Sequence, residues 1–585
     1  MELNILNRIN SPKDLKALNQ EDLPLLADEI RQVIIEKVSQ TGGHFGPNLG
    51  MVEATIAMHY VFNSPVDKIV YDVSHQCYPH KILTGRKHGF IDPEQFASIT
   101  GYSSPKESEH DFFTVGHTST SISLACGLAK ARDVKGEKEN IIAVIGDGSL
   151  SGGEAYEGLN NAAASGKNMI ILVNDNDMSI AVNHGGLYKN LAELRQSNGT
   201  CENNFFKSLG FDYRFVPNGH DIDALINVFS EVKDTEKPVV IHMYTVKGKG
   251  YKPSESNKEG FHYVGPFNLE TGKQLYSFNG ENYGQIIDNF LCEKAKTDEK
   301  VIAITAGTPG VVGLNKFRYE FPEQFMDVGI AEEHAVALAS GLASQGAKPV
   351  LGLYSSFIQR TYDQLSQDLA INNNPALILV FGSRISSADV THLGVFDIAL
   401  VSNIPNIVYL APTTKEEYLA MVEWGLEQNE HPVVVRVPGG PVISTKEEVA
   451  PNFSQLNCYQ KMNDGSKVAI LALGSFYTLG QNVQEKLKSI TGIEATLINP
   501  RFASGIDEAL LTQLLANHQI IVTLEDGVLD GGFGEKISRF YADKEIKVLN
   551  YGATKEFTDR EDINLLYERY RLREDLIVED IKRLL

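Results

Sequence analysis

The stretch from Gly146 to Asn176 constrains the fold more than any other part of this sequence. Two apolar runs, 141–145 and 169–173, are separated by small residues that predict a helix over about 153–164. The first run is followed by Gly-Asp-Gly and the second by Asn-Asp-Asn. Apolar runs joined by a helix are typical of adjacent parallel strands that are buried on both faces. The pattern therefore predicts a doubly wound α/β sheet.

The polar residues after these runs predict a site for magnesium and a diphosphate. Because parallel strands end at the same edge of a sheet, Asp147 and Asn176 should lie close together there. A carboxylate, an amide oxygen and the backbone carbonyl of Met178 are ligands that Mg²⁺ accepts beside phosphate oxygens. The N–H groups after Gly148 suit the phosphates themselves. A surface turn that binds nothing is the alternative.

Composition narrows the class of protein. A length of 585 residues predicts about three domains. The formal net charge of −22 disfavours nucleic-acid binding. The five cysteines include no CxxC pair, which fits a reducing cytoplasm. No run approaches about 18 apolar residues and residues 1–10 lack the pattern of a signal peptide, so neither a membrane span nor export is expected.

Two histidines lie in loops next to predicted elements. His44 belongs to a glycine-rich loop, and His75 follows a predicted strand over 69–73. Either side chain is suited to proton transfer near neutral pH, although for each one alone a structural role is equally open. Gly116 to Ser121 begin a predicted helix that runs to about 131. The hydroxyl and N–H groups of this segment either bind an anion or cap the helix.

The remainder of this first region holds two more candidates. Lys247 follows a predicted strand over 239–244 and can meet phosphate there, unless it is simply solvated. His262 ends a polar loop. Residues 179–215 are polar and rich in turn formers and predict a mobile excursion, and 264–285 predict a linker.

A second α/β unit begins at a predicted strand over 301–305, and a third begins near Lys467. The third alternates strands and helices and is predicted to be structural. In the second, polar and aromatic residues follow predicted strands or begin helices. They are Glu332, Tyr354 and Phe357, Arg360 on a predicted helix over 358–371, Arg384 after a predicted strand over 376–381, and Asp389 and His392 in the loop beyond. For Glu332 the alternative role is a helix-dipole interaction of about 0.3–1 kcal/mol.

Together these segments resemble the 1-deoxy-D-xylulose-5-phosphate synthases, thiamine-diphosphate enzymes of the transketolase superfamily. The matching stretches are Thr41–His44, Asp72–Gln76, Tyr78–Arg86, Gly116–Ser121, Gly146–Ile180, Lys247–Tyr251, Ile330–Val336, Tyr354–Gln364, Asn499–Phe502 and Gly531–Gly534. The resemblance implies three consecutive doubly wound α/β domains of the transketolase type. They would be a pyrophosphate-binding domain over 1–278, a pyrimidine-binding domain over 279–450 and a C-terminal domain over 451–585.

The resemblance also implies roles for individual residues. Glu332 would hydrogen-bond the pyrimidine ring of thiamine diphosphate, on which Phe357 would stack. Mg²⁺ would be held by Asp147, Asn176 and the carbonyl of Met178. The other cofactor-binding residues would be His75, Gly116, His117, Thr118, Gly148, Ser149 and Lys247. Proton transfer would fall to Glu332, His44, His75 and His392, and the substrate pocket would comprise His44, His262, Tyr354, Arg360, Arg384, Asp389 and His392.

The reaction implied by the resemblance joins two small molecules. Pyruvate loses CO₂, and the remaining two-carbon unit adds to the aldehyde of glyceraldehyde 3-phosphate to give 1-deoxy-D-xylulose 5-phosphate. In the family this product feeds isoprenoid, thiamine and pyridoxal synthesis. The resemblance therefore predicts a transferase with thiamine diphosphate and Mg²⁺ as cofactors, small-molecule substrates, no nucleic-acid or membrane partner, and a cytoplasmic homodimer.

The departures from the family pattern lie mainly on the acceptor side. Ser383 replaces the family's aspartate before Arg384, and the loop from there to His392 is shorter, which leaves the placement of Asp389 open. Gly439 stands where the family has an arginine for the acceptor phosphate, and Arg436 is the nearest arginine in sequence. Loss of one charge-assisted contact costs about 1.5–3 kcal/mol of binding. The excursion after Met178 is also shorter, and Pro47 replaces a small polar residue.

These departures keep a second function open, a divergent carboligase or transketolase-like enzyme that uses another, possibly unphosphorylated, aldehyde. Two further alternatives are weaker. A non-catalytic sensor of thiamine diphosphate is disfavoured because Asp147, Asn176 and Glu332 are all present. The first component of a 2-oxo acid dehydrogenase is disfavoured by the two histidine loops.

Overall fold

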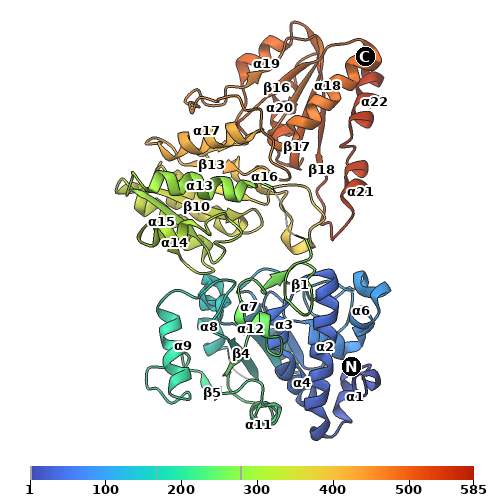
Figure 1. Cartoon of the computed structure of the whole chain (residues 1–585), viewed down its shortest axis with the longest axis vertical. Helices are drawn as coiled ribbons and strands as arrows, with labels where there is room; N and C mark the ends of the chain where they lie inside the picture. The colour runs from blue at the N-terminus through green and yellow to red at the C-terminus, as the bar shows by residue number, and fades with distance from the viewer. Residues whose placement is uncertain (1–2, 166–167, 277–279) are drawn as a thin grey trace. The chain divides into compact units, whose positions relative to one another are not determined.

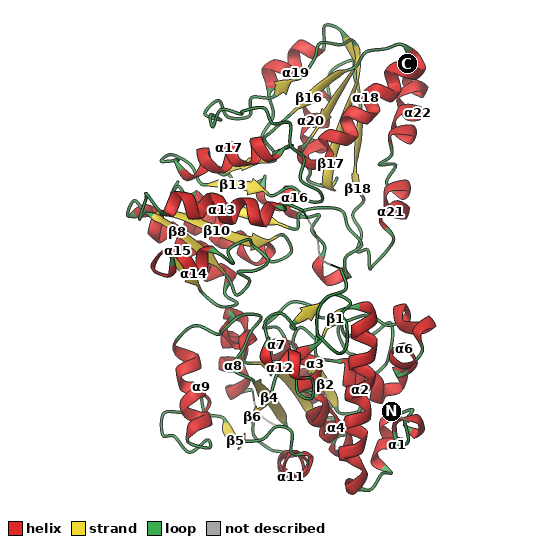
Figure 2. Cartoon of the chain, in the orientation of Figure 1, coloured by secondary structure: helices red, strands yellow, loops and turns green. Residues whose placement is uncertain are grey.

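The computed structural model describes residues 3–165, 168–276 and 280–585. The chain divides into two compact units, one formed by Met1–Asn279 with Gly329–Ala331 and the other by Gly280–Val328 with Glu332–Leu585. Both units consist of mainly parallel sheets flanked by helices (Figures 1 and 2). Within the described ranges, no helix has the length and apolarity that crossing a bilayer requires.

The first unit contains a five-stranded parallel sheet in the order β2-β3-β4-β6-β5. Its strands are β2 (Lys68–Tyr71), β3 (Ile141–Gly146), β4 (Met169–Asp175), β5 (Asp212–Val216) and β6 (Val239–Tyr244). Alternate residues of β3 enter different cores: Ile142 and Val144 pack on one face, and Ile141, Ala143 and Ile145 on the other. Because both faces are buried, the strands are continuously apolar, as the sequence indicated.

Helices cover both faces of this sheet (Figure 1). One core includes residues of α2 (Leu23–Thr41), α4 (Val52–Val61) and α11 (Ile222–Val232). The opposite core includes residues of α7 (Ser121–Lys135), α8 (Gly153–Ala164) and α9 (Gly186–Gln196). The predicted helix over 153–164 is confirmed at both ends, whereas the helix expected from Gly116 begins only at Ser121.

The predicted mobile excursion over 179–215 is wrong. The segment contains α9, the short α10 (Phe205–Ser208) and the edge strand β5. Tyr188, Leu191 and Leu194 recur at helical spacing and are buried. Charged residues between them hid this pattern. The predicted linker over 264–285 overlaps β7 (Tyr263–Val264) and α13 (Tyr283–Ala295), and its residues 277–279 lie outside the described ranges.

A small antiparallel pairing joins two loops that are far apart in the sequence. β1 (Gly43–His44) pairs with β7, and His44 lies opposite Tyr263 in the register. The pairing brings the glycine-rich loop of His44 beside the segment that carries His262.

The second unit contains two sheets. The first is a six-stranded parallel sheet in the order β12-β13-β11-β10-β8-β9. Its strands are β8 (Val301–Thr305), β9 (Phe325–Asp327), β10 (Lys348–Tyr354), β11 (Leu377–Phe381), β12 (Val408–Leu410) and β13 (Val433–Arg436). Among its helices are α13, α15 (Glu332–Ser344), α16 (Asp397–Val401) and α17 (Lys415–Leu426). The predicted helix over 358–371 is instead a 3-10 turn, Ile358–Thr361, followed by a π-helix, Gln364–Ala370.

The last sheet has the order β14-β16-β15-β17-β18, and only β14 is antiparallel to its neighbour. The strands are β14 (Gln460–Lys461), β15 (Lys467–Ala472), β16 (Thr496–Asn499), β17 (His518–Val528) and β18 (Lys547–Ala553), with helices α18 (Tyr477–Thr491), α19 (Glu508–Leu514), α20 (Phe533–Tyr541), α21 (Ile563–Arg569) and α22 (Glu574–Leu584). One hydrophobic core contains residues of both sheets, such as Ile304 and Ile521. The predicted domain boundaries remain predictions, and the one at 278/279 falls outside the described residues.

Candidate active site

Asp147 follows β3 directly and is buried at the carboxyl edge of the first sheet. Its Oδ2 accepts hydrogen bonds from the backbone N–H of Met178, at 3.0 Å, and from Nδ2 of Asn183, at 2.7 Å. Burial and the nearby charge of Asp175 raise the pKa of Asp147 to about 8. The carboxyl group is therefore held in a place where a nearby positive charge would stabilise its ionised form. Asn183 was not anticipated, because nothing in its local sequence marks it.

Three buried oxygen atoms beside Asp147 have no hydrogen-bond partner among the described residues. They are Oδ1 of Asn176, Oγ of Ser179 and Oδ1 of Asn183. Gly148 lets the two loops approach, since a Cβ at this position would stand 2.8 Å from Cβ of Ser179. Buried polar atoms in folded proteins are nearly always paired, so these atoms are suited to contact a bound ligand. Carboxylate, amide and hydroxyl oxygens at one sheet edge fit Mg²⁺ and a diphosphate.

Asp175, the middle residue of Asn-Asp-Asn, has a different environment. Its carboxylate is 2.8 Å from Nε2 of His242 and 2.6 Å from a guanidinium nitrogen of Arg195. Although burial opposes ionisation, the hydrogen bond from His242 and the charge of Arg195 hold the pKa of Asp175 below its ordinary value. The carboxylate of Asp175 is therefore paired with side chains of the protein. Its contact with Arg195 holds α9 against the sheet. No local pattern marks these contacts, since the partners are 67 and 20 positions away.

Lys247 joins this edge of the sheet to the histidine loops. Its Nζ donates to the carbonyl of Ser179 at 2.6 Å and lies 3.1 Å from Nδ1 of His262. Burial lowers the pKa of Lys247 to about 7. Ser179 is thus bounded by Lys247 on its carbonyl and by Gly148 on its side chain. This places the predicted phosphate lysine next to the predicted metal site.

Three of the predicted histidines form a cluster. The ring centroids of His44 and His75 are 5.2 Å apart, those of His75 and His262 are 5.2 Å apart, and those of His44 and His262 are 5.7 Å apart. Burial, reinforced by the charge of Lys247, holds the pKa of His262 well below its ordinary value. His262 is therefore neutral at physiological pH. Tyr102 and Tyr263 also pack edge-on against His44, and neither was anticipated.

The loop that carries His75 has an unusual backbone. Val73 and Ser74 have φ angles of 57° and 63°, a region that side chains with a Cβ rarely adopt. Ser74 is held in place because its Oγ donates to the carbonyl of Val115 at 2.7 Å. Such strained turns persist only where the surrounding structure fixes them, and they are frequent at functional sites.

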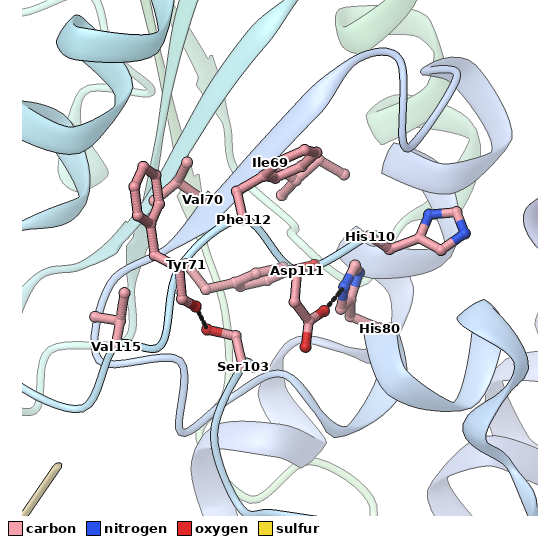
Figure 3. Close-up of a pocket in the computed structure, with 10 residues that line it drawn as sticks. Ile69, Val70, Tyr71, His80, Ser103, His110, Asp111, Phe112 and Val115 are labelled. Carbon is pink, nitrogen blue, oxygen red and sulfur yellow. Dashed lines mark hydrogen bonds and ion pairs between the residues drawn. The ribbon is translucent and has the colours of Figure 1, made fainter. Parts of the chain in front are cut away.

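A buried ionic network lies behind this loop. Nε2 of His80 is 2.9 Å from Oδ1 of Asp111, as Figure 3 shows. Arg86 donates to both oxygens of Asp111, at 2.6 and 2.9 Å. His80 also contacts His59, whose Nε2 is 2.8 Å from its Nδ1. The network anchors α5 (Tyr78–Lys81), the element that follows His75.

The segment of Gly116, His117 and Thr118 leads into α7. The N–H groups of Ser119 and Ser121 donate to the carboxylate of Asp72, at 2.8 and 3.0 Å. Oγ of Ser119 donates to the carbonyl of Ser149 at 2.8 Å. Asp72 therefore fills the capping role at this helix, and the contact with Ser149 ties the segment to the edge that carries Asp147 and Gly148.

In the second unit, Glu332 is the first residue of α15 and is buried. Among the residues that the structure describes, its Oε2 has no hydrogen-bond partner, and it lies 3.6 Å from a guanidinium nitrogen of Arg360. Burial raises the pKa of Glu332, although Arg360 opposes the shift. A buried carboxyl that retains its proton can share a hydrogen bond with a ring nitrogen, as the predicted role requires.

The aromatic residues of the second unit lie together. Phe357 is 5.6 Å from Tyr354 and 5.8 Å from His392, measured between ring centroids. Burial lowers the pKa of His392 to about 4, so this imidazole is neutral. Burial also raises the pKa of Tyr354, against the opposing charge of Arg384. Asp389 forms an ion pair with Arg560 at 3.7 Å, so its carboxylate already has a partner within the chain.

The two arginines near the departure at Gly439 differ in their surroundings. A Cβ at Gly439 would stand 2.7 Å from Cδ of Arg384, so the stem of Arg384 fills the space that a larger residue would need. Arg436 is buried, donates from Nε to Asp397 at 2.7 Å, and also donates to the backbone carbonyl of Asp526. The guanidinium of Arg436 is therefore paired within the protein and stabilises the fold.

Comparisons with known proteins cover nearly the whole chain. Residues 6–202 and 196–245 match the family model described as 1-deoxy-D-xylulose-5-phosphate synthase, residues 280–441 match the pyrimidine binding domain of transketolase, and residues 459–562 match the transketolase C-terminal domain. The 1-deoxy-D-xylulose-5-phosphate synthase of Caldanaerobacter subterraneus subsp. tengcongensis is 41% identical over 99% of this chain and 98% of its own length. The synthase of Alkaliphilus oremlandii is 40% identical over 99% of each chain.

Among solved structures, a transketolase from Leishmania mexicana is 15% identical, covers 96% of this chain and 97% of its own, and has a TM-score of 0.43. The family assignment rests on the sequence matches, which extend over both units. This chain belongs to the 1-deoxy-D-xylulose-5-phosphate synthase family.

Proposed function

We propose that this chain decarboxylates pyruvate and ligates the two-carbon unit to D-glyceraldehyde 3-phosphate, giving 1-deoxy-D-xylulose 5-phosphate and CO₂. The observation that carries the proposal is the edge of β3 and β4, where Asp147 lies beside buried oxygens of Asn176 and Ser179 that have no partner. These oxygen atoms could contact Mg²⁺ and the diphosphate of the cofactor that this family uses.

The cofactors in this proposal are thiamine diphosphate and Mg²⁺. Asp147, Asn176 and the carbonyl of Met178 would hold the cation, and Gly148, Ser149 and Lys247 would contact the diphosphate. When bound, thiamine diphosphate supplies a site that takes up the electron pair released with CO₂. The chain itself would orient the cofactor, exclude water and move protons.

Burial favours the neutral form of three proposed proton-transfer residues. It raises the pKa of Glu332, against the charge of Arg360, and so favours the protonated carboxyl that would hydrogen-bond the pyrimidine ring. His262 and His392 are neutral because burial lowers the pKa of each. A neutral imidazole can give or take one proton, and these residues, with His44 and His75, are the proposed proton carriers around the substrates.

Arg384 is the cation that we assign to the acceptor phosphate. Arg436 is not assigned to the phosphate, since its guanidinium already donates to Asp397 and to the carbonyl of Asp526. Arg384, by contrast, packs over Gly439 and acts on the pKa of Tyr354, a proposed pocket residue. Tyr354, Arg360, Asp389 and His392 would complete the pocket.

Gly439 favours a second candidate function, ligation to an aldehyde without a phosphate. Because the family's phosphate-binding arginine is absent at Gly439, the discrimination in favour of phosphate would be weaker by roughly 10–150-fold. The assembly we propose is a homodimer in the cytoplasm. A monomer by light scattering that still turns over would contradict the dimer.

The test measures CO₂ and sugar product with pyruvate, Mg²⁺ and thiamine diphosphate, and compares glyceraldehyde 3-phosphate with glyceraldehyde. A clear preference for the phosphorylated acceptor supports the synthase and removes the second candidate. CO₂ release with poor formation of the sugar phosphate would overturn the synthase and point to another aldehyde.

A further inference from the structure

Val246, the residue before Lys247, makes an unusual backbone hydrogen bond. Its N–H donates to Nε2 of a side chain, His220, at 2.8 Å. Val246 and Lys247 follow β6, so this bond fixes the backbone at the point where the chain leaves the sheet. Two other contacts limit the same turn: Gly248 N–H donates to the carbonyl of Gly46 at 3.0 Å, and the carbonyl of Val246 faces Gly50.

The bond to Val246 determines the protonation of His220. A backbone N–H can only donate, so Nε2 must carry a lone pair and the proton must lie on Nδ1. Nδ1 is 2.9 Å from Oε2 of Glu53, which accepts that proton in a hydrogen bond. His220 is therefore a neutral imidazole that bridges a carboxylate and a backbone amide. A second proton, on Nε2, would face the N–H of Val246 and break the bridge.

Glu53 is itself held by a second partner. Arg31 donates to Oε1 of Glu53 at 2.5 Å, and the side chains of both residues are about nine-tenths buried. Although burial opposes ionisation, the hydrogen bond from His220 and the charge of Arg31 hold the pKa of Glu53 below its ordinary value. The chain of contacts thus runs from α2, through α4, to the turn of Lys247. The charged groups that line the cleft beside His220 are Glu21, Asp28, Glu53, Asp221 and Asp223.

The other end of this chain of contacts is the candidate cofactor site. Nζ of Lys247 donates to the carbonyl of Ser179, whose neighbour Met178 donates its N–H to Asp147. Lys247 has no freedom to compensate for a shift of its backbone, because it is buried and its stem packs close to Gly46. A displacement of Val246 would therefore move the amine away from the edge that carries Asp147.

We propose that His220 is a positioning residue for Lys247, acting through the backbone of Val246, and that its contribution is to the binding of thiamine diphosphate. The proposal rests on the proposed function, since that function supplies the ligand of Lys247. His220 itself makes no contact with the predicted metal ligands in the described part of the chain.

The test compares His220→Phe with His220→Gln in the full-length protein. Phenylalanine keeps a ring but no acceptor, whereas the amide of glutamine can still accept from Val246 and donate to Glu53. Titration calorimetry with Mg²⁺ and thiamine diphosphate should show Kd raised about tenfold in His220→Phe and within about threefold of the wild type in His220→Gln. At saturating cofactor, kcat of both variants should match the wild type. His88→Phe, at an exposed histidine, is the control.

A second measurement covers the case in which His220→Phe fails to fold. His220→Leu also lacks an acceptor for the N–H of Val246 and should raise Kd about as much as His220→Phe, whereas His220→Gln should not. A normal Kd in a folded His220→Phe or His220→Leu, or an equal rise of Kd in His220→Gln, would overturn the proposal. Because the binding assay uses no substrate, a wild type that binds the cofactor but makes no sugar phosphate would overturn the proposed function and leave this inference standing.

Discussion

Asp147 and Arg436 occupy similar places in two different sheets, but their surroundings are opposite. Asp147 follows β3 and Arg436 ends β13, and both are almost fully buried, at 1% and 4% exposure. Within the described part of the chain, Asp147 has only amide donors as its hydrogen-bond partners, and the buried Oδ1 of Asn176 next to it has none. Arg436 is paired with Asp397 and with the carbonyl of Asp526.

The difference separates a ligand site from a structural ion pair. A charged residue at a strand end is the expected feature of a site in an α/β sheet, and the sequence places both residues there. Asp147 and Arg436 differ in whether a side chain of opposite charge is paired with them in the described structure. Burial and the nearby charge of Asp175 raise the pKa of Asp147, whereas the carboxylates around Arg436 hold the pKa of its guanidinium above the ordinary value despite burial.

The largest effect on stability is expected from a substitution of Arg436, the charged residue that is paired within the protein. Arg436→Met should lower the free energy of unfolding by about 3–5 kcal/mol, because it removes the cation that is paired with the buried carboxylate of Asp397. Urea denaturation measures the loss. At a temperature where the variant is folded, KM for the aldehyde acceptor should stay within about twofold of the wild type. An unchanged stability together with a raised acceptor KM would assign Arg436 to the substrate instead.

A substitution of Asp147 should instead affect activity and leave stability intact. Asp147→Asn should leave the stability of the cofactor-free protein unchanged or higher, while kcat/KM falls by roughly a thousandfold, or about 4 kcal/mol, because the proposed Mg²⁺ site would lose the carboxylate of Asp147. Steady-state kinetics and denaturation are measured on the same preparation. Asp177→Asn is the matched control, since Asp177 lies between Asn176 and Met178 on the loop after β4 but is exposed and paired with Arg195. Equal losses in both variants would contradict a metal role for Asp147.

Arg384, the other arginine near Gly439, should differ from Arg436 in its effect on acceptor binding. Arg384→Met should raise KM for glyceraldehyde 3-phosphate by about 10–150-fold, the worth of one charge-assisted phosphate contact. KM for pyruvate and for unphosphorylated glyceraldehyde should be unaffected. If glyceraldehyde is affected to the same degree, Arg384 shapes the pocket and does not bind phosphate.

The smallest expected effect concerns the pH dependence of stability. Since burial raises the pKa of Glu332 in the folded state, its favourable contribution is complete below the unfolded pKa of about 4.3 and is lost as pH rises through the folded value. Glu332→Gln keeps the neutral form at every pH. The cofactor-free variant should therefore match the wild type near pH 4 and exceed it by about 1–2 kcal/mol near pH 7. A constant difference between the two proteins across this range would show that Glu332 does not titrate abnormally.

Sequence and structure agree best where the signal is local. Asp147 and Asn176 were predictable because each directly follows an apolar strand, and the helix over 153–164 because its small residues are contiguous. The partners that decide the function of these residues are distant. Asn183 reaches Asp147 from a segment whose charged residues concealed α9, and Asp397 and Asp526 reach Arg436 across 39 and 90 positions. No periodicity reports contacts of that kind, so the sequence alone left both arginines as candidates.

The most direct test of the account measures thiamine diphosphate binding by titration calorimetry, with and without Mg²⁺, on the wild type, Asp147→Asn and Arg436→Lys. The account predicts that binding to the wild type requires Mg²⁺, that Asp147→Asn weakens it at least about a hundredfold, and that Arg436→Lys changes it by less than about threefold. Magnesium-dependent binding that survives in Asp147→Asn, or that is lost only in Arg436→Lys, would contradict the assignment of the β3–β4 edge as the cofactor site.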